Sequence, residues 1–230
     1  TLPEKKILII LDKLNSRLLI NCSNKKIGVK TINISSKINP KNNICTDTFL
    51  EKKLGILDEK NELYVLFTSG STGDPKGVIL SYENILNTLL WSKYYLKWKS
   101  KDIIGVATSF SFDISIFDLF TSLYFNVPTY IFKNPSNSSE VLKEIKKFKI
   151  SSIFSLPSFF SNFVRYNLLN NKIKYLRQII SGGDFFPHYD LLRWIKSLPF
   201  LNIYNVWGPT ETSIVNSMYK IKNKDLSLIK

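Results

Sequence analysis

Ten consecutive residues of this 230-residue chain combine a flexible backbone with polar side chains suited to binding phosphate. Residues 68–77 read Thr-Ser-Gly-Ser-Thr-Gly-Asp-Pro-Lys-Gly. Glycines let backbone N–H groups turn toward an anion, hydroxyls add donors, and a lysine adds positive charge. The stretch is not a P-loop, because Pro75 stands where a glycine is required and Lys76 precedes a glycine rather than Ser or Thr. A flexible linker is the alternative, although linkers seldom carry Pro, Lys and Gly in this order.

A second stretch, residues 205–212, carries side chains suited to a nucleotide. The Trp207 ring offers a flat face for adenine, the Asn205 amide can pair with the exocyclic amine of the base, and Thr210 can donate to the α-phosphate. Glu211 supplies a hard oxygen ligand for Mg²⁺. The alternative is a strand that ends in a Gly-Pro turn, with Trp207 in the core and Glu211 in solvent.

An acidic residue, Asp113, stands between Phe112 and Ile114 at the start of an expected helix. A carboxylate in apolar surroundings is costly unless it has a partner, and a charged hydrogen bond there contributes about 1.5 to 3 kcal/mol. Asp113 is therefore a candidate for binding a cationic group. The alternative is that Asp113 only caps the helix.

Apolar runs of strand length alternate with segments of helical period along most of the chain. The expected strands cover residues 63–68, 103–108, 127–132, 150–154, 176–180 and 201–204. The expected helices cover residues 81–96, 114–124, 139–147, 157–169 and 187–197, with Ser139 as a cap. This alternation predicts an α/β fold with a mainly parallel, doubly wound sheet, in which ligands bind at the carboxyl ends of the strands.

The first sixty residues have a weaker pattern. Residues 3–14 are expected to be helical and residues 17–21 to form a strand, whereas residues 31–58 read as an irregular polar stretch. No linker or internal repeat stands out, so no domain boundary is predicted.

Composition indicates a folded protein without an obvious metal or redox site. Hydrophobic residues make up 44% of the chain, with nine Gly and nine Pro, which excludes disordered and collagen-like classes. The longest aliphatic run, residues 7–11, is too short to span a bilayer, so we expect a soluble protein. Cys22 and Cys45 lack metal or redox spacing, and His188 is the only histidine. We therefore expect a reduced, cytoplasmic setting.

The net charge of +14 raises the question of an anionic partner. Only four of the 32 basic residues are arginines, the type that base readout and bidentate phosphate contacts favour. The lysines are also scattered along the chain. A basic nucleic-acid-binding domain is therefore a distant alternative, and we expect no nucleic acid and no membrane partner.

Residues 68–77 resemble the signature loop of the adenylate-forming (AMP-binding) enzymes, the superfamily of acyl-CoA synthetases, luciferases and peptide-synthetase adenylation domains. Residues 205–212 are similar to the second nucleotide motif of that family, with Trp207 where Tyr is usual. Residues 181–184 resemble the small-residue turn that precedes this motif, and residues 1–6 resemble a segment ahead of the loop. The resemblance covers essentially the whole chain.

The resemblance implies ATP and Mg²⁺ as cofactors. It makes Lys76, Thr210 and Glu211 the catalytic residues, with Glu211 as the ligand of Mg²⁺. The nucleotide-binding residues that it implies are Thr68, Ser69, Gly70, Ser71, Thr72, Gly73, Lys76, Gly77, Gly183, Asp184, Asn205, Trp207, Gly208 and Thr210. We expect the loop at residues 68–77 and the segment 207–211 to face each other across one cleft.

In family members that activate amino acids, an Asp at the position of Asp113 pairs with the α-ammonium group of the substrate. The other implied substrate-binding residues are Ile114, Phe117, Ser155, Ile180, Gly182, Val206, Ile214 and Val215. None of these is charged, so we expect a neutral substrate side chain that is small or aliphatic. A fatty or aryl acid would leave Asp113 unpaired, and an acyl-CoA or aryl-CoA ligase is the alternative within this fold.

The implied reaction is ATP-dependent activation of an amino acid as aminoacyl-AMP, followed by transfer to the phosphopantetheine thiol of a carrier protein. The resemblance is strongest to adenylation domains of nonribosomal peptide synthetases and to the D-alanine ligase of carrier proteins. The family's upstream segment, ribose-binding Asp motif and small C-terminal domain are not found in residues 1–230. We therefore expect a partial large domain that binds nucleotide weakly and does not form adenylate at a useful rate alone.

Overall fold

A computed structural model describes residues 3–16, 19–21, 31–33, 58–69, 75–169, 173–222 and 225. The chain divides into two compact units, residues 1–58 with 67–77 and residues 59–66 with 78–230. Each unit is described by itself.

The first unit contains helix α1 (Glu4–Lys13) and two short parallel strands, β1 (Leu19–Asn21) and β2 (Thr31–Asn33). The helix predicted for residues 3–14 is confirmed, and β1 lies within the strand predicted for residues 17–21. The irregular stretch predicted for residues 31–58 is wrong at its start, because β2 pairs there with β1. Residues 34–57 of that stretch lie outside the described residues.

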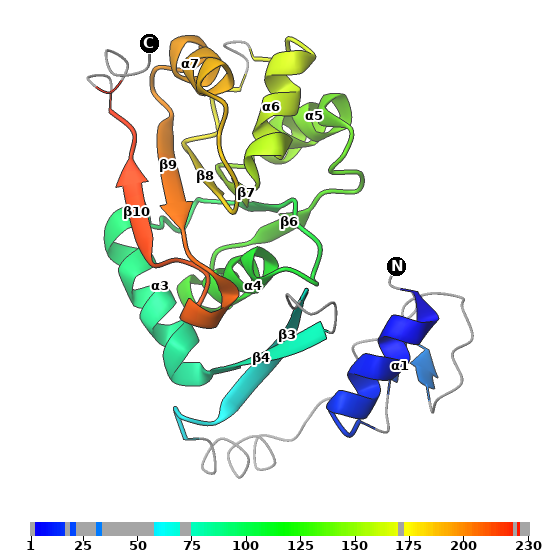
Figure 1. The fold of residues 1–230 in the computed structure, drawn as a ribbon. Coiled ribbons are helices and arrows are strands. Elements are labelled where there is room, and N and C mark those ends of the chain that lie inside the picture. The colour runs from blue at the N-terminus through cyan, green and yellow to red at the C-terminus, as the bar shows by residue number, and fades with distance from the viewer. Residues whose placement is uncertain are drawn as a thin grey trace, which may run out of the picture. The chain divides into compact units, whose positions relative to one another are not determined.

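The second unit is built on a six-stranded sheet in the order β10-β9-β8-β7-β5-β6 (Figure 1). The strands are β5 (Ile104–Val106), β6 (Thr129–Ile131), β7 (Ser152–Ser155), β8 (Gln178–Gly182), β9 (Asn202–Trp207) and β10 (Ser217–Lys220). The first five run parallel to their neighbours, and β10 runs antiparallel to β9. The predicted parallel sheet is confirmed, whereas β10 was not predicted.

Helices cover both faces of this sheet. The cluster on one face is formed by α3 (Tyr82–Leu96) and α4 (Asp113–Phe125) with Phe154, Ile180 and Tyr204 of the strands. The strand residues one position earlier, Ile153 and Ile179 among them, belong to the opposite cluster with α5 (Ser138–Phe148), α6 (Pro157–Arg165) and α7 (His188–Ser197). Because neighbouring strand residues point to opposite faces, the sheet is doubly wound as predicted.

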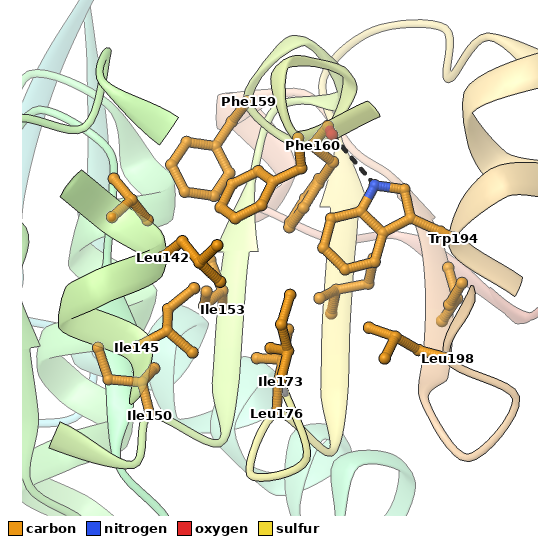
Figure 2. Packing of buried hydrophobic residues seen from close by; sticks show 14 of the residues in the cluster. Leu142, Ile145, Ile150, Ile153, Phe159, Phe160, Ile173, Leu176, Trp194 and Leu198 are labelled. Atoms are coloured by element: carbon orange, nitrogen blue, oxygen red, sulfur yellow. Dashed lines mark hydrogen bonds between the residues drawn. The ribbon is translucent and has the colours of Figure 1, made fainter. Parts of the chain in front are cut away.

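The α5/α6/α7 cluster is rich in aromatic side chains and contains one buried polar group that is satisfied. Trp194 of α7 packs edge-on against Phe160 of α6, and its indole Nε1 donates to the Phe160 carbonyl oxygen at 3.0 Å (Figure 2). A buried indole N–H usually needs such a partner. The contact fixes α7 against α6, and both side chains belong to the cluster that includes Ile179 of β8 and Ile203 of β9.

Side chains at the helix ends explain where the helices begin and stop. Ser81 and Asn84 form a capping box at the start of α3. Asn137, and not Ser139 as expected, caps α5, because its side chain accepts from the backbone N–H groups of Ser139 and Glu140. Helix α6 ends at Arg165 rather than residue 169, because Asn167 adopts a left-handed conformation with φ of 50°.

Strands β3 (Glu62–Ser69) and β4 (Pro75–Ser81) form a separate two-stranded sheet. They flank residues 70–74, which lie outside the described residues. Within the described ranges, no helix has both the length and the apolar character needed to cross a membrane.

A buried ion pair joins the amino ends of the central strands. Asp102, which is 1% exposed, accepts from Arg177 Nε at 2.7 Å and from Ser151 Oγ at 2.9 Å. Arg177 also donates through Nη1 to the carbonyl oxygen of Leu96 at 3.1 Å. The pair therefore ties the end of α3 to residues just before β5, β7 and β8.

Removing the charge of Asp102 should destabilise the fold. Asp102→Asn leaves the Arg177 guanidinium without its anionic partner, and we expect the free energy of unfolding to fall by about 3 kcal/mol. Urea denaturation measures this change. Glu140→Gln replaces an exposed acid on α5 and should change stability by less than about 1 kcal/mol. Equal losses in both variants would contradict a structural role for this pair.

The same pair should make stability depend on pH. Burial alone would raise the pKa of Asp102, but hydrogen bonds from Arg177, Ser151 and the Lys99 N–H lower it below its ordinary value. Such a carboxyl stabilises the fold above the unfolded-state pKa of about 3.9, and this contribution is lost as pH falls through the folded-state pKa. The stability difference between the wild type and Asp102→Asn should therefore be constant above about pH 5 and shrink as the pH falls below that value. A constant difference would disprove the assignment.

Candidate active site

Two neighbouring parallel strands, β5 and β7, lead into helices on opposite faces of the sheet. The chain leaves β5 into α4 and leaves β7 into α6, and open α/β sheets bind ligands where connections diverge in this way. A cavity of about 290 Å³ lies at this point. Ile114 and Ser155, two of the predicted substrate-binding residues, line it together with Thr108 and Phe112.

Asp113 is the first residue of α4 and is half-buried beside this cavity. The Thr210 hydroxyl donates to Asp113 Oδ2 at 2.9 Å, although the two residues are 97 positions apart. The N-cap position belongs to Phe112, so Asp113 is not the cap residue that the alternative interpretation required. The structure therefore gives this carboxylate a partner from another predicted motif.

The electrostatic surroundings of Asp113 oppose its ionisation. Burial raises the pKa of Asp113, and the negative charge of Glu211 raises it further. Hydrogen bonds from Thr210 and from the Ile114 N–H lower it, but the net pKa stays above the ordinary value. A cation bound here would relieve this unfavourable environment, because an opposite charge favours the ionised form.

Thr210 is positioned by the connection between β9 and the antiparallel strand β10. This connection includes a short 3-10 helix (Thr210–Thr212), after which Ser213 and Ile214 both have left-handed backbones, with φ of 65° and 77°. The conformation is strained for Ile214, because its side chain is β-branched. The Thr88 hydroxyl holds the turn by donating to the Ser213 carbonyl oxygen at 3.0 Å.

Gly208 is required at the start of this connection for a steric reason. A Cβ atom at this position would lie 2.6 Å from the Ile214 carbonyl oxygen and 2.8 Å from the Asn216 backbone nitrogen. Only a residue without a side chain allows the turn to close against β9. The Gly-Pro turn foreseen in the alternative interpretation is thus present, and it serves to hold Thr210 beside Asp113.

The predicted apolar substrate-binding residues come together in the structure. Six of them are buried members of the cluster formed by α3 and α4, namely Ile114, Phe117, Ile180, Val206, Ile214 and Val215. The other two, Ser155 and Gly182, are buried at the last positions of β7 and β8. A Cβ atom on Gly182 would lie only 2.5 Å from Val206 Cγ2, which shows how closely β8 and β9 approach there.

The predicted nucleotide-binding residues of the second unit are accessible. Trp207 is 65% exposed, so the alternative that places it in the core is wrong. Also exposed are Gly183, Asp184, Asn205 and Glu211. Gly208 is the first residue after β9. Their side chains and backbone are therefore available to a ligand at the carboxyl ends of β8 and β9.

The predicted loop of the first unit is described only at its ends. Lys76 and Gly77 are exposed, Thr68 is half-buried, and the Lys13 ammonium donates to the Pro75 carbonyl oxygen at 2.7 Å. Gly70, Ser71, Thr72 and Gly73 lie outside the described residues, as does the side chain of Ser69. The expected cleft between this loop and residues 207–211 stays a prediction.

The exposed carboxylate of Glu211 is suited to binding Mg²⁺. Mg²⁺ is commonly held by one or two carboxylates together with substrate phosphates and water. Within the described ranges no group of three or more His, Cys, Asp or Glu residues gathers to hold a metal ion. Glu211 would therefore hold Mg²⁺ jointly with phosphate oxygens rather than within a protein cage.

One residue near Asp113 was missed in the sequence. Tyr64 on β3 packs against the α3/α4 cluster, and its buried hydroxyl has no hydrogen-bond partner among the described residues. Burial raises the pKa of Tyr64, and the charge of Asp113 adds to the increase. An apolar strand pattern is the only local signal at residue 64, and that pattern predicts packing rather than a polar role.

The chain matches the AMP-binding enzyme family over residues 1–228, and it belongs to that family. Bacitracin synthase 3 from Bacillus licheniformis is 27% identical over 99% of this chain and 4% of the relative. The L-proline--[L-prolyl-carrier protein] ligase of Streptomyces coelicolor is 31% identical over 70% of this chain and 31% of the relative. The chain thus spans less than a third of either curated relative.

A solved structure with the same fold is the O-succinylbenzoate coenzyme A synthetase of Bacillus subtilis in complex with AMP. Its TM-score is 0.76 at 18% identity, and the match covers 95% of this chain and 44% of the other. At this identity the likeness shows the fold alone. The expected α/β architecture of an adenylate-forming enzyme is confirmed.

Substitutions around Asp113 should move its pKa in opposite directions. Thr210→Val removes a hydrogen bond that lowers the pKa of Asp113, so that pKa should rise, whereas Glu211→Gln removes a negative charge and should lower it. Carbon NMR titration of the Asp113 carboxyl measures both shifts. Thr210→Ser keeps the hydroxyl and should change little. Shifts of the same sign in Thr210→Val and Glu211→Gln would refute this geometry.

Proposed function

We propose that this chain is part of an AMP-forming ligase that activates an amino acid as its aminoacyl-AMP. The observation that carries the proposal is Asp113, a half-buried carboxylate at the edge of an apolar cluster, held by Thr210 of the predicted nucleotide motif. The family match supports adenylate chemistry in general. The acidic residue narrows the substrate to a carboxylic acid that also carries a positive charge.

An α-ammonium group suits the environment of Asp113 better than any neutral group does. Its charge would offset the repulsion between Asp113 and Glu211, and it would add a charged hydrogen bond in a place with little water. The Asp113 carboxylate accepts from Thr210 and from the Ile114 N–H, and the ammonium group would bind to lone pairs that these donors leave open. A substrate without the ammonium group would leave the carboxylate unpaired.

The reaction needs positioning and charge neutralisation, not an enzyme nucleophile. An oxygen of the substrate carboxylate attacks the α-phosphorus of ATP, the bond to the bridging oxygen breaks, and pyrophosphate leaves with that electron pair. In this proposal Thr210 donates to the α-phosphate, while Lys76 neutralises charge on the outer phosphates. Mg²⁺, held in part by Glu211, supplies further charge neutralisation when bound.

Thr210 would then have two partners at different stages, the Asp113 carboxylate in the free protein and the α-phosphate when nucleotide is bound. Its hydroxyl has a single proton to donate, so it can donate to only one of them at a time. The amino-acid and nucleotide sites would therefore be linked through this side chain. The ammonium group of the substrate would take over the partner role that Thr210 gives up.

We further propose that the activated acyl group passes to the phosphopantetheine thiol of a carrier protein. The name of the proline ligase from Streptomyces coelicolor includes a carrier protein, and this chain is 31% identical to it over the matched region. The thiol would attack the carbonyl carbon of the adenylate and expel AMP. The substrates and partners of the whole protein belong to this proposal, because the chain spans only part of its relatives.

An acyl-CoA or aryl-CoA ligase is the second candidate, and the fold favours it equally. The coenzyme A synthetase with a TM-score of 0.76 has the same architecture. The difference lies in Asp113, because a carboxylate at this position disfavours an acid that brings no cation. Exchange assays with an amino acid and its deamino analogue separate the two candidates.

Neutralising Asp113 should reduce amino-acid activation selectively. In the full-length protein we expect Asp113→Asn to lower kcat/KM for the amino acid by about 10- to 100-fold in ATP–pyrophosphate exchange, which corresponds to one charged hydrogen bond. The deamino analogue should lose far less or improve. Asp190→Asn on α7 is the matched control and should retain activity. Equal activity of the wild type on both acids would exclude an amino-acid ligase.

The side chain of the preferred amino acid should be neutral. The predicted pocket residues are apolar or small and buried, so a charged side chain would lose its hydration without gaining a partner. A panel of amino acids in the same exchange assay should therefore favour small or aliphatic members. A clear preference for lysine or glutamate would disprove this part of the proposal while leaving amino-acid activation intact.

A further inference from the structure

A second cavity, of about 550 Å³, lies at the other edge of the sheet from Asp113. It is lined at the amino end of β9 by Asn202, at the carboxyl end of antiparallel β10 by Lys220, and at the end of α3 by Leu96. None of the predicted site residues lines it. We call it the amino-edge pocket, and its volume is in the range of small-ligand sites in proteins.

Four lysines give the amino-edge pocket its charge. Lys97 and Lys99 follow α3, while Lys220 and Lys222 lie at the end of β10. Among the described residues, no acid lines the pocket and none of the four lysines has an ion-pair partner. Their like charges repel one another, so an anion bound among them would be stabilised by all four.

Among the described residues, two acids contact the pocket lining, and both bond to residues of its wall. Asp102 pairs with Arg177, and Asp225 accepts from the Tyr219 hydroxyl at 2.9 Å and from the Lys222 backbone nitrogen at 2.6 Å. The contact with Lys222 is to its backbone and leaves the ammonium group available. Against these two carboxylates the lining carries four lysines and Arg177, so its net charge stays positive.

Arg177 contributes to the wall of the pocket but not to its binding capacity. Its guanidinium donates to Asp102, to Gln178 Oε1 at 2.7 Å and to the carbonyl oxygens of Leu96 and Lys97. Its donors are thus occupied by the protein. The lysines are flexible, and each carries three donors as a compact charge, a form of recognition that suits phosphate groups.

Tyrosine rings stand beside the lysines with much of their surface in solvent. Tyr94 is 72% exposed, Tyr95 60% and Tyr219 48%. The buried Tyr204 ring forms the floor, with Lys220 Nζ 6.0 Å from its centroid and its hydroxyl donating to the Tyr95 carbonyl oxygen. Exposed aromatic faces next to basic groups bind planar rings by stacking and phosphates by charge.

We propose that the amino-edge pocket binds a nucleotide-type anion, with its ring on the exposed tyrosines and its phosphates among Lys97, Lys99, Lys220 and Lys222. This site is distinct from the proposed ATP site and does not depend on the proposed function. A free nucleotide and a nucleic-acid strand share this chemistry. The pocket is sized for a single small ligand, so the proposal commits to the free nucleotide.

Photolabelling with 8-azidoadenosine triphosphate, followed by peptide mapping, tests the proposal on the full-length protein. We expect label on the peptides that contain Tyr94 and Tyr95 or Tyr219, and an excess of ATP or inorganic tripolyphosphate should suppress it. Label on residues 205–211 reports the proposed active site separately. Absence of label from the tyrosine peptides would overturn this proposal, whatever happens at residues 205–211.

Charge reversal supplies the matched test. Lys220→Glu with Lys222→Glu should reduce labelling of the tyrosine peptides by about tenfold or more, and leave label at residues 205–211 unchanged. The control is Lys143→Glu with Lys196→Glu, which makes the same change in net charge at exposed positions of α5 and α7. This control should not reduce labelling of the tyrosine peptides. Similar losses in both double variants would overturn the proposal. Should the first double variant melt early, Lys97→Gln with Lys99→Gln replaces it.

An oligonucleotide distinguishes the two sources of this chemistry. Single-stranded oligothymidine should bind no more tightly than ATP at the amino-edge pocket and should compete with the label only weakly. Oligothymidine that binds more tightly than ATP, with a steep dependence on salt and sensitivity to Lys220→Glu with Lys222→Glu, would overturn the free-nucleotide proposal in favour of a strand-binding site.

Discussion

The hydrogen bond between the Thr210 hydroxyl and the Asp113 carboxylate depends on the parallel sheet and on the turn after β9. A carboxylate at the edge of an apolar cluster is tolerated only where donors are supplied to it. The parallel sheet brings these donors together, because the exits of β5 and β9 lie on the same edge although the two residues are 97 positions apart. The position of Asp113 is thus a consequence of strand direction.

The cost of holding Thr210 in place is spread over several residues of the turn that follows β9. Ile214 carries a left-handed backbone, and a side chain at position 208 would clash with the backbone of the turn. Thr88 of α3 satisfies a carbonyl group that the turn would otherwise bury without a partner. Strain of about 1 to 3 kcal/mol per residue persists only where surrounding packing fixes it, and the α3/α4 cluster provides that packing.

Much of the fold follows from sequence because buried parallel strands are covered on both faces and read as continuous apolar runs. Strand β10 escaped prediction because it lies at the sheet edge, where only Met218 packs against the core and its neighbours are exposed. The end of α6 was placed too late because Leu168 and Leu169 continue the helical period. Their partial burial in the core arises after the backbone has already turned at Asn167.

Resemblance to a family predicted the residues of the candidate site, but it did not predict the contact between Asp113 and Thr210. Nothing in the local sequence links residue 113 to residue 210, because a hydrogen bond over 97 positions is a property of the assembled sheet. Tyr64 was overlooked for the same reason, since its hydroxyl becomes distinctive only once its burial without a partner is known. Sequence patterns predict which face of a helix or strand a residue occupies. The chemistry of a side chain depends on the groups that contact it in the folded protein.

Strand β9 runs from the amino-edge pocket to the candidate active site. It begins at Asn202 in the wall of the amino-edge pocket and ends at Trp207, about 17 Å away at the rise of an extended strand. β9 pairs with β8 over Asn202–Val206 and with β10 over Tyr204–Trp207, and this pairing holds the two sites at a fixed separation. Coupling between sites requires an element with two discrete arrangements, and a paired strand is one arrangement. We therefore expect a ligand in the amino-edge pocket to be detected by where it binds.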